Sequence, residues 1–492
     1  MKEDPTINYA FALKQYNQNG RGRSMKKFCD EEGYDYEKFM QYSRRGQKDY
    51  SVLKEADDRQ SSGVVFTLSE YDGFRVDGAT TVNINDVSEF QYTFWSPTTG
   101  SLGKKQLYIT PKRFTDEALD LFYISLMVYC VDKRVSRKEQ DDSWTRSLEI
   151  YVPVLQLEKW ESCKDTLTKA LCFLTGDHWT LHFRSRVELT ADEDSYRKGK
   201  WRFRRSIRIT DADIFCMLSG GLDSFIGAIN LLSDGKKPMF VSHYGGGKGV
   251  KNYQDRVVRS ISARYGVGLE RFFRFYAASS NGLEDSTRSR SLMFFAHAFV
   301  LASGMGHHVD LIIPENGVIS LNIPLTVMRL GSLSTRTTHP YFMGQLQKLL
   351  IDLGLDITLI NPFQMLTKGE MIKQCKDQTY LASHYQYTLS CSHPDQGRWT
   401  GDDAGHCGEC LPCTIRRAAI MAAGLNDVST YRHNYDTEEG VKALKSYKLG
   451  LATPKDSYAA IQMSGPITEH KEEYVKLYEE GIKELKSFID SL

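Results

Sequence analysis

From Asp211 onward the sequence repeats one order of elements, an apolar strand followed by a turn and a helix. The expected strands cover residues 214–219, 238–244, 270–277, 309–315 and 356–363. Strands that alternate with helices form a parallel sheet with helices on both faces, so we predict an α/β, doubly wound fold. Ligands of such sheets bind beyond the carboxyl ends of the strands, where the functional residues are therefore expected.

The first of these turns reads Ser219-Gly220-Gly221-Leu222-Asp223-Ser224 and opens a helix. Two glycines let the backbone approach a charged group, and the amides of a helix start point toward an anion. Asp223 would repel a phosphate unless Mg²⁺ were bound as well, which indicates a site for ATP with Mg²⁺. The simpler alternative is a Gly-Gly turn whose serine caps the helix. The Walker spacing of P-loop proteins is missing.

Four of the ten cysteines stand close together in the sequence, and they are Cys391, Cys407, Cys410 and Cys413. Four thiolates complete a tetrahedral shell around Zn²⁺, so we predict a structural zinc site. The CxxCxxC spacing also occurs in iron–sulfur ligation, and free buried cysteines are a third alternative. His393 and His406 stand beside these cysteines and could replace one ligand.

The N-terminal 205 residues carry no catalytic pattern. We expect three helices in residues 1–60. The first covers 9–16, the second begins at Ser24 with Phe28 and Cys29 facing inward, and the third begins at Asp35, after a turn at Gly33, and carries Phe39 and Tyr42. This order of elements is typical of a helix-turn-helix, so one interpretation of the segment is DNA binding. The alternatives are a segment that docks a partner protein and a solvated helical extension. For residues 61–205 we predict an α/β accessory domain that binds a partner. Its hairpins are expected at Asp72-Gly73 and Asp77-Gly78.

The remaining boundaries follow from changes in sequence character. The charged run 190–206 predicts a linker, with phosphate steering by its arginines as the alternative. Residues 206–440 form the predicted catalytic domain, and residues 441–492 form a C-terminal helical segment. In that segment one apolar stripe is expected to dock on the core, and it consists of Tyr474, Tyr478, Ile482, Leu485, Ile489 and Leu492.

Composition excludes several classes of protein. The 63 Lys and Arg residues balance 62 Asp and Glu residues, so the net charge of +1 provides no general attraction to nucleic acid or membranes. The longest nearly apolar run, 292–302, is far shorter than the ~20 residues that cross a bilayer. The N-terminus lacks the apolar core of a secretory signal, so we expect a cytoplasmic protein without membrane contact.

The strand, the SGGxDS turn and the helix together resemble the PP-loop of ATP pyrophosphatases, which have the adenine nucleotide alpha-hydrolase-like fold. Members of that family cleave ATP between its α- and β-phosphates. The resemblance implies that the pyrophosphate end of ATP is held by Ser219, Gly220, Gly221, Asp223 and Ser224.

The PP-loop, the later cysteine group and Arg416-Arg417 are similar to 7-cyano-7-deazaguanine synthase, the QueC family, over about 211–425. The resemblance implies a 7-deazaguanine carboxylate as substrate, the cofactors ATP, Mg²⁺ and Zn²⁺, and an ATP-dependent C–N ligase. It also implies catalytic roles for Asp223, Arg290 and Lys368. His243 and the residues after it depart from the family's Tyr-Gly-Gln, and segments 314–317 and 334–340 differ as well, so the acceptor stays open.

The longer region 89–425 resembles QatC, the QueC-like component of the bacterial Qat anti-phage system, through segments such as 120–137 and 152–179. This resemblance implies a partner protein of a defence operon, whose amine could replace ammonia as acceptor. The alternatives are a housekeeping synthase of queuosine-type biosynthesis, a PP-loop tRNA thiolase with an iron–sulfur cluster, and a scaffold or DNA-binding protein with an inactive PP-loop.

Overall fold

The computed structural model describes residues 24–40, 63–92, 98–99, 104–105, 107–140, 142, 144–186, 206–208, 211–244, 248–280, 282–284, 288–322, 336–397, 403–453 and 456–492. The chain separates into two compact units. Residues 1–62 and 77–79 form the first, and residues 63–76 and 80–492 form the second. The predicted helix 9–16, Tyr42 and nearly all of the predicted linker lie outside the described residues.

The first unit contains α2 (Met25–Glu32), which begins where Ser24 accepts a hydrogen bond from the Lys27 amide. It ends at Gly33, whose φ of 76° is the left-handed conformation that glycine adopts most easily. The backbone is helical again over 36–40. Phe28 and Cys29 pack with Phe39 in a small core, which confirms the inward face predicted for this segment. DNA contact stays a prediction.

The accessory region forms a four-stranded sheet in the order β2-β1-β7-β8. Its strands are β1 (Val64–Thr67), β2 (Thr80–Asn83), β7 (Ser147–Val154) and β8 (His178–Ser185). Two helices follow β1 and β2 and precede β8, namely α4 (Asp116–Arg134) and α5 (Leu157–Thr175). Thr115 caps α4 by accepting from the Ala118 amide, and Gly176 ends α5 in the left-handed conformation.

The predicted hairpin between β1 and β2 is wrong. The two strands run parallel, with Val64 opposite Thr80. Between them the chain must therefore cross back to the end of the sheet at which β1 begins. Residues 68–79 make this crossover, and a crossover of about a dozen residues is what parallel neighbours require. Asp72-Gly73 and Asp77-Gly78 lie in this crossover and do not close a hairpin.

The second sheet has six strands in the order β14-β13-β10-β11-β12-β3. Five strands are parallel, and they are β10 (Ile214–Met217), β11 (Met239–Tyr244), β12 (Phe272–Ser279), β13 (Val309–Ile312) and β14 (Ile357–Ile360). The sixth, β3 (Phe90–Tyr92), comes from the accessory region and pairs antiparallel with β12. The predicted parallel sheet is confirmed, and an accessory strand extends its edge.

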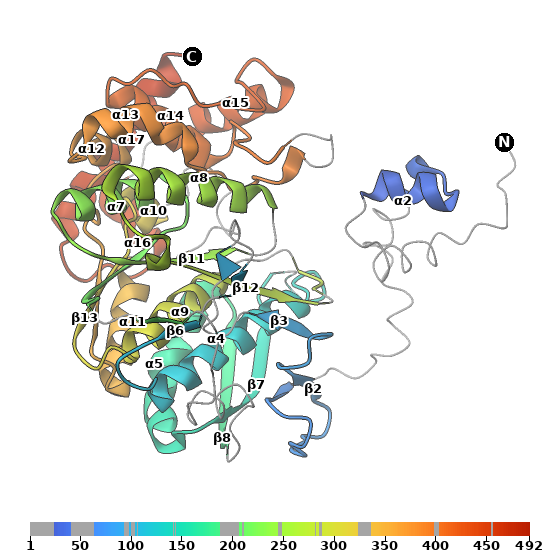
Figure 1. Cartoon of the computed structure of the whole chain (residues 1–492). Coiled ribbons are helices and arrows are strands. Elements are labelled where there is room, and N and C mark those ends of the chain that lie inside the picture. Colours follow the sequence, from blue (N-terminus) through green and yellow to red (C-terminus); the bar gives the residue numbers. More distant parts are fainter. Residues whose placement is uncertain are drawn as a thin grey trace, which may run out of the picture. The chain divides into compact units, whose positions relative to one another are not determined.

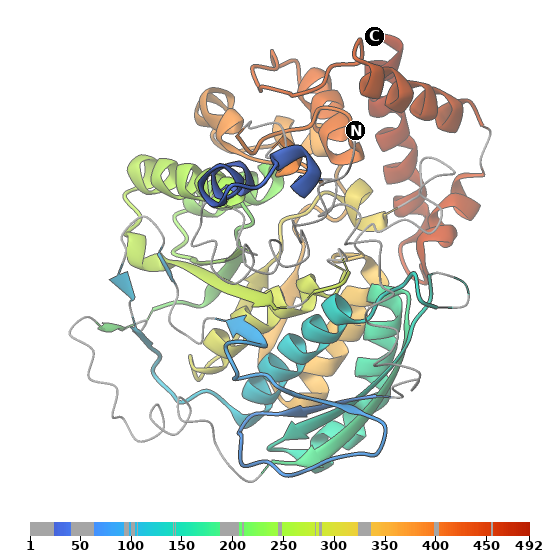
Figure 2. The ribbon, with the colours of Figure 1, turned by 90° about the vertical axis from the view of Figure 1, so that its right-hand side faces the viewer.

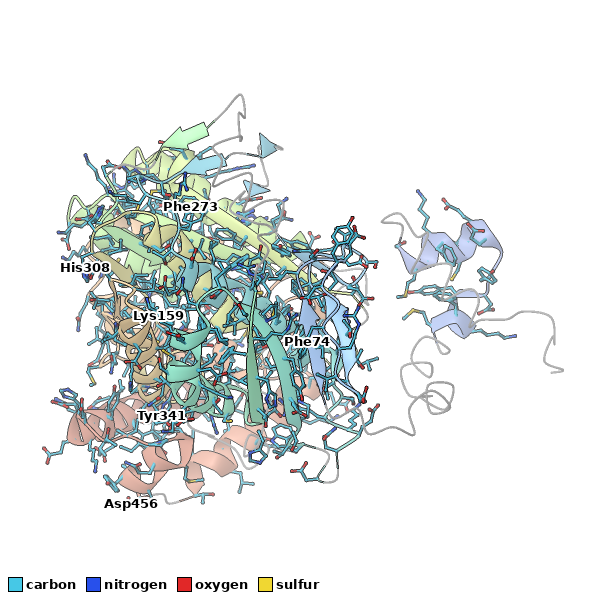
Figure 3. All side chains as sticks on the ribbon, turned by 90° about the horizontal axis from the view of Figure 1, so that it is seen from below. Phe74, Lys159, Phe273, His308, Tyr341 and Asp456 are labelled. Atoms are coloured by element: carbon cyan, nitrogen blue, oxygen red, sulfur yellow. The ribbon has the colours of Figure 1, made fainter. Side chains whose placement is uncertain are left out.

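Helices cover both faces of this sheet (Figure 1). Residues of α7 (Leu222–Ser233) and α8 (Lys248–Tyr265) pack with Cys216 of β10, whereas α4 and α9 (Arg290–Ser303) pack with Phe215 and Met217. Consecutive residues of β10 thus enter different cores, which explains why the strand is apolar throughout. Figure 2 shows these layers from the side, and Figure 3 labels Phe273 on β12 and Phe74 in the accessory region.

The remaining elements complete the second unit. They are β4 (Thr98–Thr99), β5 (Lys104–Lys105), β6 (Leu107–Ile109), β9 (Ser206–Arg208), α10 (Gly317–Leu321), α11 (Pro340–Leu353), α12 (Lys368–Lys373), α13 (Gln378–His384), α14 (Leu411–Ala422), α15 (Glu438–Ala452), α16 (Ser457–Ser464) and α17 (Lys471–Asp490), with 3-10 turns at Leu269–Arg271 and Tyr385–Tyr387. Short pairings join β4 to β5 and β6 to β9.

The C-terminal helix α17 docks through an apolar stripe, as predicted. Tyr474, Tyr478, Leu485 and Ile489 are buried in a third core that α14 shares. Leu492 is the exception, because it lies beyond the end of the helix and is 49% exposed. None of the helices in the described residues combines the length and the apolar character that a membrane span requires.

Candidate functional site

The strand order reverses between β10 and β13, which lie side by side although β11 and β12 come between them in the chain. In doubly wound sheets, ligands bind in the crevice at this reversal, at the carboxyl ends of the strands. The turn after β10 contains Ser219–Ser224, and the turn after β13 contains Glu315 and Asn316. The candidate site is therefore built where these two turns meet.

The turn after β10 has the conformation of an anion-binding loop. Gly220 has a φ of 88°, and a Cβ atom there would approach the Gln254 side chain to 2.9 Å, so glycine is required on two grounds. Gly221 is the N-cap of α7, and the Ser224 hydroxyl donates to its carbonyl oxygen at 3.0 Å. The Ser219 and Ser224 hydroxyls lie 3.1 Å apart. The predicted turn and helix start are thus as expected.

Asp223, in the first turn of α7, is 5% exposed and meets three groups. Lys368 Nζ lies 2.7 Å from its Oδ1, and the backbone and side-chain amides of Asn316 donate to Oδ2 at 3.1 and 2.7 Å. Burial alone would raise the pKa of this carboxyl, but the Lys368 charge and the hydrogen bonds hold it below its ordinary value. Asp223 is therefore ionised. Its ion pair with Lys368 brings together two of the residues predicted to be catalytic.

Glu315 adds a second acid to this cluster. Burial raises its pKa well above the ordinary value, and the negative charge of Asp223 acts in the same direction. The protonated form of Glu315 is therefore favoured, and a cation bound beside it would favour loss of the proton. In the sequence Glu315 and Asn316 stand out only as part of a departure from the QueC family. The signal that could have found them is their position directly after a parallel strand.

Lys368 is the first residue of α12 and is 4% exposed. Thr367 and Glu370 form a reciprocal capping box at this helix start, with Thr367 Oγ1 accepting from the Glu370 amide at 3.1 Å. The cap fixes where α12 begins, and thereby directs Lys368 toward Asp223. The segment Thr367-Lys368-Gly369-Glu370 is thus a helix start that carries a buried cation.

Arg290 is the first residue of α9 and is exposed, and it forms no ion pair with any residue that the structure describes. It is therefore not brought together with Asp223 and Lys368. Its positive charge does reach His243, at the end of β11, where burial first, and then the neighbouring charges, lower the pKa of the imidazole well below its usual range. Arg290 is thus an exposed cation at the start of the helix that follows β12.

Two basic residues of the segment 334–340 have structural contacts. Arg336 donates to the carbonyl oxygen of Phe173 at 3.0 Å and lies over its ring. His339 is fully buried at the N-cap of α11, where its Nδ1 accepts from the Tyr341 amide. Ser334 and Thr335, from the same segment, lie outside the described residues.

The four predicted cysteines converge. The Sγ atoms of Cys391, Cys407, Cys410 and Cys413 all lie within 4.8 Å of one another, and two of the pairs are 3.9 and 4.0 Å apart. Four sulfurs around one Zn²⁺ with bonds of about 2.3 Å would stand about 3.8 Å apart. An iron–sulfur cluster would hold them farther apart, because iron and sulfide atoms stand between them. The cluster fits a single zinc ion.

Backbone amides support the thiolates of this cluster. Cys391 Sγ accepts from the His393 and Cys407 amides, each at 3.3 Å, and Cys407 Sγ accepts from the Cys410 amide at 3.3 Å. His406 Nδ1 lies 3.8 Å from Cys413 Sγ, while its Nε2 contacts the carbonyl oxygen of Thr388. His406 therefore contacts the sulfur of Cys413 from outside the group of four donors and does not replace one of them.

Comparison with protein families identifies a match in the C-terminal half of the chain. Residues 338–424 match the family described as Queuosine biosynthesis protein QueC. A search of the curated proteins found no match. The QueC-like domain runs from α11 through the cysteine cluster into α14 and includes Lys368, while the loop Ser219–Ser224 lies outside it. The match supports a 7-cyano-7-deazaguanine synthase-like, ATP-dependent enzyme.

Proposed function

We propose that this chain uses ATP to activate a 7-deazaguanine carboxylate and transfers the activated acyl group to an amine. One observation carries the proposal. The glycine loop of α7 meets Lys368, which belongs to the QueC-like domain, through the buried ion pair with Asp223. A phosphate-binding loop and a residue of a deazaguanine-type domain therefore act on one site.

The proposed reaction has two steps. A carboxylate oxygen of the substrate attacks the α-phosphorus of ATP, the bond from that phosphorus to the bridging oxygen breaks, and pyrophosphate leaves. The amine then attacks the acyl carbon, AMP leaves with the oxygen that joined it to the acyl group, and the amine loses a proton. The second step forms the new C–N bond.

The residues at the site suit these steps. The amides at the start of α7 and the hydroxyls of Ser219 and Ser224 would bind the pyrophosphate end, and Lys368 would neutralise its developing charge. Asp223 and Glu315 offer the carboxylate oxygens that Mg²⁺ prefers, and Mg²⁺ bound there would offset phosphate charge. The exposed Arg290 is available for the substrate carboxylate.

We further propose that the acceptor is an amine of a partner protein and that the chain acts as the QatC component of an anti-phage system. The support is the resemblance of 89–425 and the accessory region, which joins the catalytic sheet through β3. Asp132 of α4 also bonds Ser289, the residue before Arg290.

The test is to incubate the purified protein with Mg·ATP and 7-carboxy-7-deazaguanine, with and without ammonium, and to resolve the products by mass. Nitrile formation would support a biosynthetic synthase and count against the defence role. AMP without nitrile supports transfer to another amine, which intact-mass measurement of the partner protein would then detect as an added deazaguanine. AMP production independent of the deazaguanine, or none at all, would contradict the proposed substrate.

A further inference from the structure

Residues 388–391 form a short segment that contacts both the glycine loop and the cysteine cluster. On the loop side, the Leu389 amide donates to the carbonyl oxygen of Gly220 at 2.9 Å. The Ser390 hydroxyl accepts from the Leu222 amide at 3.3 Å. The segment therefore holds the two residues that flank Gly221.

On the other side the same segment is tied to the cluster. Cys391 is one of the four sulfur donors, and Cys413 Sγ lies 3.7 Å from the carbonyl oxygen of Ser390. Arg416 of α14 is fully buried and donates to Thr388 Oγ1 at 2.7 Å. An ion that draws the four sulfurs together thus fixes the position of Ser390.

The Leu222 amide is the donor that the segment 388–391 shares with a bound phosphate. It belongs to the first residue of α7, so no carbonyl of the helix is available to it, and a bound phosphate oxygen would be its natural partner. In the structure Ser390 Oγ takes that place. A hydroxyl is both donor and acceptor. When the Leu222 amide donates to a phosphate oxygen, the Ser390 hydroxyl can therefore rotate and donate to the phosphate as well.

We propose that Ser390 is a positioning residue that couples the metal site to the pyrophosphate end of the nucleotide. The metal holds the hydroxyl where the loop needs it, and a bound phosphate in turn holds the segment that carries Cys391. Coupling between two binding sites is reciprocal, so each ligand must strengthen the binding of the other by the same factor. The inference rests on the proposed function only in assigning the loop to pyrophosphate.

The first experiment compares Ser390→Ala with Ser392→Ala. Ser392 flanks Cys391 on the other side, is exposed, and has no hydrogen bond through its hydroxyl among the described residues, so it is a matched control. The probe is inorganic pyrophosphate with Mg²⁺, and its Kd is measured by calorimetry. We expect Ser390→Ala to raise the Kd about tenfold, the effect of losing one hydrogen bond to a charged group, with one metal ion per chain retained.

The second experiment measures the coupling directly. Release of the metal to a chromophoric chelator is timed with and without a fixed concentration of pyrophosphate. In the native chain and in Ser392→Ala, pyrophosphate should slow release several-fold, whereas in Ser390→Ala the two rates should be equal. Ser390→Thr keeps the hydroxyl and should restore the difference.

Several outcomes would overturn the inference. They are an unchanged Kd in Ser390→Ala, loss of the metal in that variant, and release rates that pyrophosphate does not alter in the native chain. Failure of the proposed function appears differently, as pyrophosphate binding with the expected coupling but no deazaguanine-dependent AMP.

Discussion

Arg146 of the accessory region and Lys368 of the candidate site are both buried cations, but their acids are arranged differently. Arg146 bonds Asp132 and Asp177, each at 2.6 Å, and Arg137 joins Asp177 at 2.7 Å. Two cations thus face two anions. Lys368 pairs with Asp223 at 2.7 Å, and Glu315 places a second acid in the same cluster, so that one cation faces two acids.

This difference distinguishes a charge network that stabilises the fold from a charge cluster that we propose binds a charged ligand. In the accessory network Asp132 also accepts from the Ser289 amide and hydroxyl, so its hydrogen-bonding capacity is filled by the protein. In the site burial and the charge of Asp223 raise the pKa of the second acid, so an incoming cation would favour loss of its proton. Balanced buried charge fixes the fold, and unbalanced buried charge marks the place where a charged ligand completes the set.

The sharpest way to break the accessory network is Arg146→Met. It leaves Asp132 and Asp177 buried without their shared cation, and removing one partner of a buried ion pair costs about 3–5 kcal/mol. Unfolding by denaturant should show that loss. Lys159→Met is the control, since it removes an ion pair with Glu117 in which Lys159 is 47% exposed, and it should cost no more than about 1 kcal/mol. Equal losses in both variants would contradict the comparison.

The matching change in the site is Asp223→Asn. We expect ATP–pyrophosphate exchange that depends on the carboxylate substrate to fall by about 100-fold or more, because a group that orients charge in the transition state is lost. Stability should change much less than in Arg146→Met, because Glu315 can ionise and pair with Lys368. Asp234→Asn, at the other end of α7 in an exposed pair with Lys376, should keep full exchange. A stability loss as large as that of Arg146→Met would make Asp223 structural.

The smallest expected effect is a pH dependence that Glu315→Gln removes. In the folded chain the pKa of Glu315 is raised, so the native state keeps a proton that the unfolded chain releases above about pH 4.3. Its contribution to stability therefore falls as the pH rises from that value toward the folded pKa, by at most about 1.4 kcal/mol per unit. Asp223 has the opposite sign, since its lowered pKa contributes stability that is lost only in acid.

Unfolding free energies between pH 5 and 8 would check this expectation. The native chain should lose stability more steeply with rising pH than Glu315→Gln, and the two curves should run parallel below about pH 4. Identical slopes between pH 5 and 8 would show that Glu315 does not hold a proton in the folded state.

Much of the fold followed from local pattern. The strand β10, the turn Ser219–Ser224 and the helix α7 lie next to one another in the chain, so their order alone specified the loop. The four cysteines were found for the same reason, because three of them stand in one turn. The hairpin between β1 and β2 was wrong because turn residues specify a reversal of the chain, but they do not specify which edge of a sheet the next strand joins.

The site was less predictable, because its members meet only through the sheet topology. Lys368 and Asp223 were both predicted, but their contact joins segments whose proximity depends on the reversal of strand order at β10. Ser390 passed unnoticed since its role is a bond to a distant amide. Arg290 matched a family position, yet nothing in one sequence indicated that its side chain would be exposed.

The antiparallel strand β3 has a consequence for synthesis on the ribosome. Its sheet partner β12 emerges long after it, while the four strands of the accessory sheet are complete by Ser185. Until residues 272–279 appear, β3 therefore has no sheet partner in the nascent chain, and the backbone donors and acceptors on that edge are unpaired. Unpaired strand edges invite association with other chains, so slow translation or truncation between these two points should favour aggregation.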